Sequence, residues 1–162
     1  MNHNRNHINV VWFKRDLRLL DNEAIYNAIQ SNKPTLLLYV FENSLENDPH
    51  YNARHWNFIK QSIVDINKQL AAFNTKILSV SGEVIAAFNS IQENYRIDTV
   101  YSHQETGLKI TYERDKSFKR FCKNNRINWV ENINNGIFRG LKDRNDWVSK
   151  WEKYMNAPLF IF

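Results

Sequence analysis

The fold is decided by residues 10–22, which have the sequence Val10-Val11-Trp12-Phe13-Lys14-Arg15-Asp16-Leu17-Arg18-Leu19-Leu20-Asp21-Asn22. An apolar run occupies the first four positions, and four charged side chains follow within five residues. This pattern predicts a buried strand, from about Ile8 to Phe13, that ends in a polar loop. Asp21 or Asn22 is then expected to cap a helix whose apolar positions, Ile25 and Ile29, lie one turn apart. The stretch therefore predicts a strand, a polar loop and a helix in that order.

The same alternation of strand and helix recurs along the rest of the chain. Short apolar runs predict strands, and apolar residues spaced three and four apart predict helices. Further strands are expected at residues 34–41, 76–80, 99–101 and 127–130, and further helices at 53–73, 84–91, 108–124 and 147–155. This order predicts one α/β domain, a doubly wound five-stranded parallel sheet with helices on both faces, in the Rossmann-like manner.

Composition restricts the class of protein. The 162 residues are 43% hydrophobic and 24% charged, as in a globular domain, and a net charge of +5 permits only weak attraction to polyanions. The single cysteine, Cys122, rules out an internal disulfide framework and favours a reducing, cytoplasmic setting. We expect it to be a small core residue. No apolar run approaches the roughly 18 residues of a membrane span, so no membrane partner is expected.

The two ends of the chain differ in character. Residues 1–7 are polar and lack the apolar middle of a secretory signal, so we expect a disordered leader followed by a domain over residues 8–156. Residues 157–162 are almost entirely apolar, which is unusual at a free C-terminus. We expect them to begin a connection to a further domain, with Leu159–Phe162 outside the core of this one.

Sequence motifs of common catalytic sites are missing. The chain has four glycines and contains neither a G-x-S-x-G nucleophile motif nor the G-x-G-x-x-G and G-x-x-x-x-G-K-[ST] loops that cradle phosphates. A conventional dinucleotide or P-loop enzyme is therefore disfavoured, and no catalytic residue is predicted. His50, His55 and His103 match no ligand spacing, so we interpret them as surface histidines and predict no metal site.

A row of cations marks one face of the helix expected at residues 108–124. Lys116, Lys119, Arg120 and Lys123 recur at helical spacing. Such a row can meet phosphates, but it is more often a solvated helix face, which is the interpretation we favour here.

Polar and aromatic side chains converge at the carboxyl ends of three predicted strands. The ends of the first, second and fourth strands contribute, in that order, Lys14, Arg15 and Asp16, then Phe41 and Glu42, then Gln104 and Glu105. Ligands of open parallel sheets bind at this edge, where an aromatic ring can stack on a planar ligand. Alternatively, Arg15, Asp16 and Arg18 form ion pairs that only fix the loop. The chemistry of the residues leaves both possibilities open.

The opening stretch resembles a family signature. Trp12–Asn22 is similar to the W-F-[RK]-R-D-L-R-x-x-D-N motif of the photolyase/cryptochrome family. Tyr39–Glu42 resembles the end of that family's second strand, Arg54 and Trp56 resemble the start of the following helix, and Glu113–Asp115 resembles its arginine-aspartate pair. The resemblance covers essentially the whole chain, although only the first motif is diagnostic.

The resemblance implies an N-terminal α/β domain that binds a light-harvesting (antenna) chromophore of the folate or deazaflavin type. Excitation energy would pass to FAD, which is expected only in a C-terminal helical domain that this chain lacks. The residues that the resemblance assigns to the chromophore are Lys14, Arg15, Asp16, Phe41, Arg54, Gln104 and Glu105. The loop Gln104–Leu108 departs from the patterns with which better-known members hold either chromophore, so the chromophore's identity stays open.

For the whole protein, the resemblance implies light-driven DNA repair by a photolyase, a carbon-carbon lyase, or blue-light signalling by a cryptochrome. The present domain alone is expected to be a monomer, to be inactive, and to meet DNA only through the helical domain. Two other hypotheses remain: a stand-alone nucleotide-binding α/β module, and a purely structural domain that docks the helical one.

Overall fold

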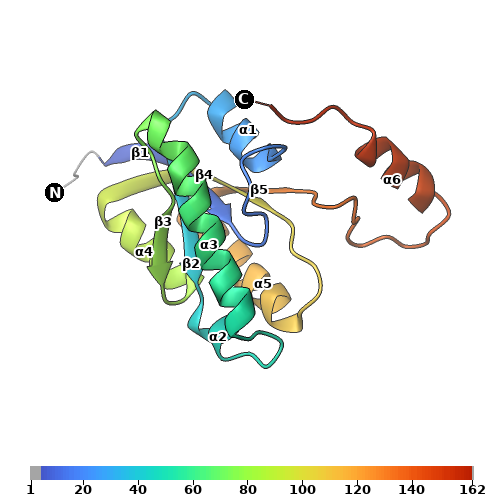
Figure 1. The fold of residues 1–162 in the computed structure, drawn as a ribbon, viewed down its shortest axis with the longest axis horizontal. Helices are drawn as coiled ribbons and strands as arrows, with labels where there is room; N and C mark the ends of the chain where they lie inside the picture. The colour runs from blue at the N-terminus through green and yellow to red at the C-terminus, as the bar shows by residue number, and fades with distance from the viewer. Residues whose placement is uncertain (1–4, 162) are drawn as a thin grey trace.

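The computed structural model describes residues 5–161 and contains one five-stranded sheet, whose strands are all parallel (Figure 1). The strands lie in the order β3-β2-β1-β4-β5. Their bounds are β1 Asn6–Phe13, β2 Thr35–Phe41, β3 Leu78–Ser81, β4 Tyr95–His103 and β5 Asn128–Asn132. The chain starts at the centre, winds outward through β2 and β3, and returns to the other side of β1. This order confirms the predicted doubly wound α/β fold.

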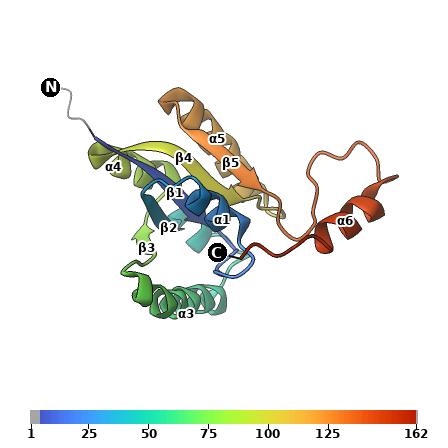
Figure 2. The same ribbon diagram turned by 90° about the horizontal axis from the view of Figure 1, so that it is seen from above.

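Helices cover both faces of the sheet (Figure 2). One face is covered by α1 (Glu23–Gln30) and α3 (Ala53–Leu70), and the other by α4 (Val84–Asn94) and α5 (Lys109–Asn125). The last helix, α6 (Trp147–Met155), was also predicted, but it projects from the body of the domain and none of its residues is buried.

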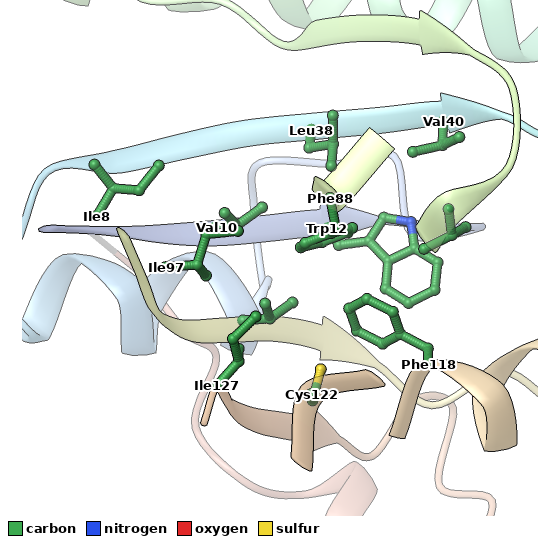
Figure 3. Close-up of a cluster of buried hydrophobic side chains, with 12 residues drawn as sticks. Ile8, Val10, Trp12, Leu38, Val40, Phe88, Ile97, Phe118, Cys122 and Ile127 are labelled. Atoms are coloured by element: carbon green, nitrogen blue, oxygen red, sulfur yellow. The ribbon is translucent and has the colours of Figure 1, made fainter. Parts of the chain in front are cut away.

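The larger core surrounds Trp12 on β1 (Figure 3). Its ring meets Phe118 of α5 edge-on, with the ring centroids 4.8 Å apart, and Phe88 of α4 at 6.1 Å. Val11 and Phe13 join the core on the opposite face. Because β1 is covered on both faces, its apolar run is continuous rather than alternating.

Three segments differ from the sequence-based expectations. β1 starts at Asn6, where it pairs with β4, so His7 is part of the sheet rather than of a disordered leader, and its Nδ1 lies 2.7 Å from Asp98 Oδ1. Residues 1–4 of the expected leader lie outside the described residues. A short helix, α2 (Asn43–Glu46), interrupts the expected loop after β2, and α3 ends at Leu70 in a 3₁₀ turn, η1 (Ala71–Phe73).

The inward face of α5 includes the predicted core residue Cys122. Thr111, Asp115, Phe118 and Cys122 are all buried. Burial raises the pKa of the Cys122 thiol to about 12, so it is protonated at neutral pH, as fits a core residue.

The segment that follows α6 returns to α1. The Phe160 carbonyl accepts a hydrogen bond from Asp21 N, and the Phe160 ring lies beside Tyr26. Leu159 and Ile161 are exposed, and Phe162 lies outside the described residues. Within residues 5–161, no helix has the length and apolar character needed to cross a bilayer.

Candidate functional site

A crevice of about 830 Å³ opens at the carboxyl edge of the sheet, between the loop after β1 and the start of α3. Its walls are rich in cationic and aromatic side chains. The lining residues are Arg15, Asp16, Leu17, Arg18, His50, Tyr51, Arg54, His55, Phe58, Ile59, Gly107 and Leu108. The crevice has the size of an ordinary small-molecule site.

The loop after β1 is held by Asn22, which is fully buried. The Asn22 Oδ1 accepts a hydrogen bond from Ile25 N and caps α1, while its Nδ2 donates to Arg18 O at 2.9 Å. The Arg18 guanidinium donates twice to the Asp21 carbonyl, and Asp21 takes a left-handed backbone conformation with φ of 53°. The last two residues of the signature therefore shape the loop that forms one wall of the crevice.

Asp16 and His103 form a buried pair below this loop. The Nδ1 of His103 lies 2.5 Å from Asp16 Oδ2, and Asp16 Oδ1 accepts a hydrogen bond from Lys14 N. Burial disfavours the charge on Asp16, but the hydrogen bond and charge of His103 outweigh it, so the pKa of Asp16 lies below its usual range. The interpretation of His103 as a surface histidine was wrong, since its position at the end of β4 places it inside the sheet edge.

An ion-pair network lies behind the crevice. Lys14 Nζ is 3.1 Å from Asp115 Oδ2 and stands 4.5 Å above the Trp12 ring. Arg114 also stacks on Trp12 and binds Asp115 Oδ1 at 2.9 Å. Burial lowers the pKa of Lys14, against the attraction of Asp115, so Lys14 depends on that carboxylate for its charge.

Two further carboxylates close the network. Glu105 is bound by Arg114 Nη2 at 2.5 Å and by Arg15 Nε at 2.8 Å, while Arg139 donates to its carbonyl oxygen. Glu42 is bound at Oε1 by Arg114 Nη1 at 2.6 Å, but Oε2 has no hydrogen-bond partner among the described residues. Burial raises the pKa of Glu42 to about 7 despite the attraction of Arg114.

The structure separates the seven residues proposed for the chromophore into three groups. Arg15, Asp16 and Arg54 line the large crevice. A second, polar cavity of about 190 Å³ is lined by Lys14, Gln104 and Glu105, together with Arg15 and Asp16. Phe41 lines neither cavity, because its ring packs against Tyr39 at 4.8 Å and faces Trp56 at 6.4 Å.

Several residues at the site were not selected from the sequence. Tyr51 forms an aromatic wall, stacked on Trp56 with the centroids 5.0 Å apart, and its hydroxyl accepts a hydrogen bond from Arg15. Arg114 and Asp115 were noted as part of the family resemblance but not assigned to the site. The sequence signal that could have assigned them to the site is a cation followed directly by an anion in the first turns of α5, on the side facing the core. Within residues 5–161, no three His, Cys, Asp or Glu side chains gather as a metal would require.

Comparisons with known proteins agree with one another. The family model described as DNA photolyase matches residues 9–138. The chain is 30% identical over 105 residues to Cryptochrome DASH, chloroplastic/mitochondrial, from Arabidopsis thaliana. The matched region covers 61% of this chain and 18% of that protein. It is 26% identical over 136 residues to Cryptochrome-1 from Drosophila melanogaster, covering 80% and 25% of the two chains.

Solved structures show the same fold. A Synechocystis cryptochrome superposes with a TM-score of 0.78 at 20% identity, covering 94% of this chain and 34% of that one. A photolyase from Sulfolobus tokodaii superposes with a TM-score of 0.72 at 17% identity, covering 94% and 35%. This chain spans about a fifth to a quarter of the length of the two curated relatives. It belongs to the DNA photolyase family, which includes the cryptochromes, and has the fold of that family's N-terminal α/β domain.

Proposed function

We propose that this chain is a light-harvesting domain that binds an anionic, planar chromophore of the folate or deazaflavin type. The observation that carries the proposal is the crevice at the carboxyl edge of the sheet, with three arginines beside two aromatic rings. Ligands of doubly wound domains bind at this edge. Energy transfer needs a positioned pigment rather than an acid, base or nucleophile, which agrees with the lack of catalytic motifs.

The charges of the crevice favour an anion. Arg15, Arg18 and Arg54 line the crevice, and the only carboxylate in the lining, Asp16, is paired with His103. Arg15 is itself paired with Glu105, so Arg18 and Arg54 supply the positive charge that remains. Arg54 is the second residue of α3 and forms no ion pair among the described residues, so its guanidinium is available to a ligand carboxylate or phosphate. Tyr51 and Phe58 offer the apolar surface on which a planar ring can rest.

The role of the whole protein is part of the same proposal. We infer that a helical domain binds FAD and that DNA, in a photolyase, meets the protein through that domain. The Sulfolobus tokodaii photolyase is described as containing two FAD molecules, with the implication of a novel light-harvesting cofactor. That description supports a second pigment in a protein of similar fold. For the whole protein to which this chain belongs, light-driven DNA repair and blue-light signalling are the two proposed functions.

The cellular location is proposed from the chain's cysteine content. The single thiol, Cys122, is buried, and the described part of the chain contains no disulfide partner for it. We propose that the protein works in a reducing compartment, the cytoplasm. We also propose that it is a monomer. The Arabidopsis relative is named as chloroplastic/mitochondrial, and those organelles are the alternative location.

A second candidate function is a structural docking domain without a pigment. The buried ion pairs of Lys14, Arg114 and Glu105 satisfy one another without any ligand, which favours this alternative. Titration of the purified chain with a folate and with a deazaflavin, followed by absorbance and fluorescence, separates the two. We expect at least one of the two compounds to bind saturably and one to one. If neither compound binds, the docking function is supported.

A further inference from the structure

The net charge of the molecule is concentrated on the solvent side of α5. Six cations lie on this surface and its C-terminal cap, with one carboxylate, Glu113, among them. They are Lys109, Lys116, Lys119, Arg120, Lys123 and Arg126, and all six are exposed. Six positive charges and one negative give +5, which equals the net charge of the whole chain. The formal charges of all other residues therefore sum to zero.

Within residues 5–161, no residue outside α5 forms an ion pair or a side-chain hydrogen bond with the six cations. Arg114 and Asp115, on the opposite side of α5, face the ion-pair network, so they do not neutralise this surface. Among the described residues, its only ion pair joins Lys116 Nζ to Glu113 Oε1 at 3.3 Å, and both side chains are about half exposed. An exposed pair of this kind contributes at most about 1 kcal/mol, so Lys116 can exchange its partner.

The spacing suits a long, regular polyanion. Lys109, Lys116 and Lys123 repeat every seven residues, two helical turns apart, so that the row extends over about 21 Å along one side of the helix. The phosphates of duplex DNA present about one negative charge per 1.7 Å of axis. A straight row of this length therefore meets several phosphates at once.

The chemistry of the surface favours a nucleic acid over a lipid membrane. A membrane-binding helix needs large apolar side chains beside its lysines. The basic side of α5 offers only Tyr112, which is 55% exposed and lies under Lys116 Nζ at 4.9 Å. Four of the six cations are lysines, which bind phosphates as point charges and lack the planar, bidentate fork with which arginine recognises bases.

We propose that the exposed side of α5 is a sequence-independent nucleic-acid backbone-binding surface, separate from the crevice and from any DNA contact of a helical FAD domain. α5 lies on the opposite face of the sheet from α3, whose first turn forms a wall of the crevice (Figure 2). Leu108, the N-cap of α5, lines the crevice, but Lys116, Lys119 and Lys123 lie two or more helical turns further along the helix. Chromophore binding and nucleic-acid binding are therefore expected to be independent, and either can fail without the other.

The test measures binding of the 162-residue chain to a fluorescein-labelled 24-base-pair duplex by fluorescence anisotropy, between 50 and 300 mM NaCl. The variant Lys116→Gln/Lys119→Gln/Lys123→Gln removes three central cations. The matched control, Lys60→Gln/Lys68→Gln/Lys76→Gln, removes three exposed lysines on and just after α3. Both leave a net charge of +2, and Gln has nearly the helix propensity of Lys, so both are expected to fold, as circular dichroism will check.

We expect the unmodified chain to bind with a Kd of about 1 to 100 μM at about 150 mM salt and more tightly at 50 mM, and two unrelated sequences to agree within about twofold. The α5 variant should bind at least about tenfold more weakly, with the slope of log K against log salt reduced by up to about 2.7, while the control changes about twofold or less.

Three results would overturn the proposal. The first is no detectable binding by the unmodified chain at 50 mM salt. The second is an equal loss in both triple variants, which would show that net charge alone matters. The third is stronger, lysine-dependent binding to phosphatidylserine vesicles than to the duplex, which would make a lipid surface the partner.

Discussion

Glu42 is a carboxyl group of the site whose ionisation is shifted by burial. One oxygen is bound by Arg114 at 2.6 Å, while the other is buried without a partner among the described residues. Arg114 also forms ion pairs with Glu105 and Asp115. The effect of burial outweighs the attraction of Arg114 and raises the pKa of Glu42 to about 7. Glu42 is thus protonated in the folded protein at a pH where an unfolded chain has lost the proton.

The first prediction follows from that difference. Between about pH 4.5 and pH 7 the folded state holds a proton that the unfolded state releases, so the free energy of unfolding falls as pH rises. Glu42→Gln should remove this fall. The free energy of unfolding of the variant minus that of the unmodified chain should therefore be larger at pH 8 than at pH 5, by up to about 3 kcal/mol. Urea unfolding at both pH values measures it, and an unchanged pH dependence in the variant would contradict it.

The second prediction concerns Arg15. Its side chain is about half exposed and binds Glu105, which keeps its ion pair with Arg114 when Arg15 is removed. Arg15→Ala should therefore lower the free energy of unfolding by less than about 1 kcal/mol. We expect it to weaken chromophore binding by about tenfold, since an ionised donor of the crevice is lost. A lower melting temperature with unchanged pigment affinity would assign Arg15 to the structure alone.

At the scale of elements, the sequence predicted best where one face of an element is buried. The burial of Cys122 on α5 and the capping of α1 by Asn22, one of the two residues proposed, follow from residue type and local spacing, and both are confirmed. The projection of α6 was not predictable, because its apolar spacing is typical of a packed helix and nothing local says what it packs against. His7 joined β1 because β4 extends to pair with it, a contact between residues far apart in the chain.

The third prediction compares two asparagine caps. Asn22 caps α1 and also fixes the loop of the crevice from a fully buried position, whereas Asn52 caps α3 from an exposed one. Asn22→Ala removes the cap and leaves buried backbone groups unpaired, so it should cost about 2 to 3 kcal/mol of stability. Asn52→Ala should cost about 1 kcal/mol, and equal losses in urea unfolding would contradict the role given to Asn22.

At the scale of the whole molecule, the site is a network that joins distant parts of the chain. The sequence predicted which loops meet, because the carboxyl ends of parallel strands lie at one edge. It left open whether their charges face a ligand or one another. In the structure, Lys14 and Glu105 of these loops are held in ion pairs, whereas Arg54, which comes from α3, lines the crevice. Side-chain pairing across 101 residues, as between Lys14 and Asp115, has no local signal.

The fourth prediction tests that network. Asp115 is buried and binds both Lys14 and Arg114, so Asp115→Ala leaves buried cations without a partner and should cost about 3 to 5 kcal/mol. Glu113→Ala, two residues away on the exposed side of the same helix, is the matched control and should change stability by less than about 0.5 kcal/mol. Similar losses in the two variants, measured by urea unfolding, would show that the network is not the stabilising element.

The central claim is that the crevice binds an anionic planar chromophore. The most direct measurement is a fluorescence titration of a folate and of a deazaflavin with the unmodified chain, with Arg54→Gln, and with the control Lys60→Gln on the exposed side of α3. One of the two compounds should bind one to one, about tenfold more weakly to Arg54→Gln, and equally well to the control. Binding that is unchanged in Arg54→Gln, or absent for both compounds, would contradict the account.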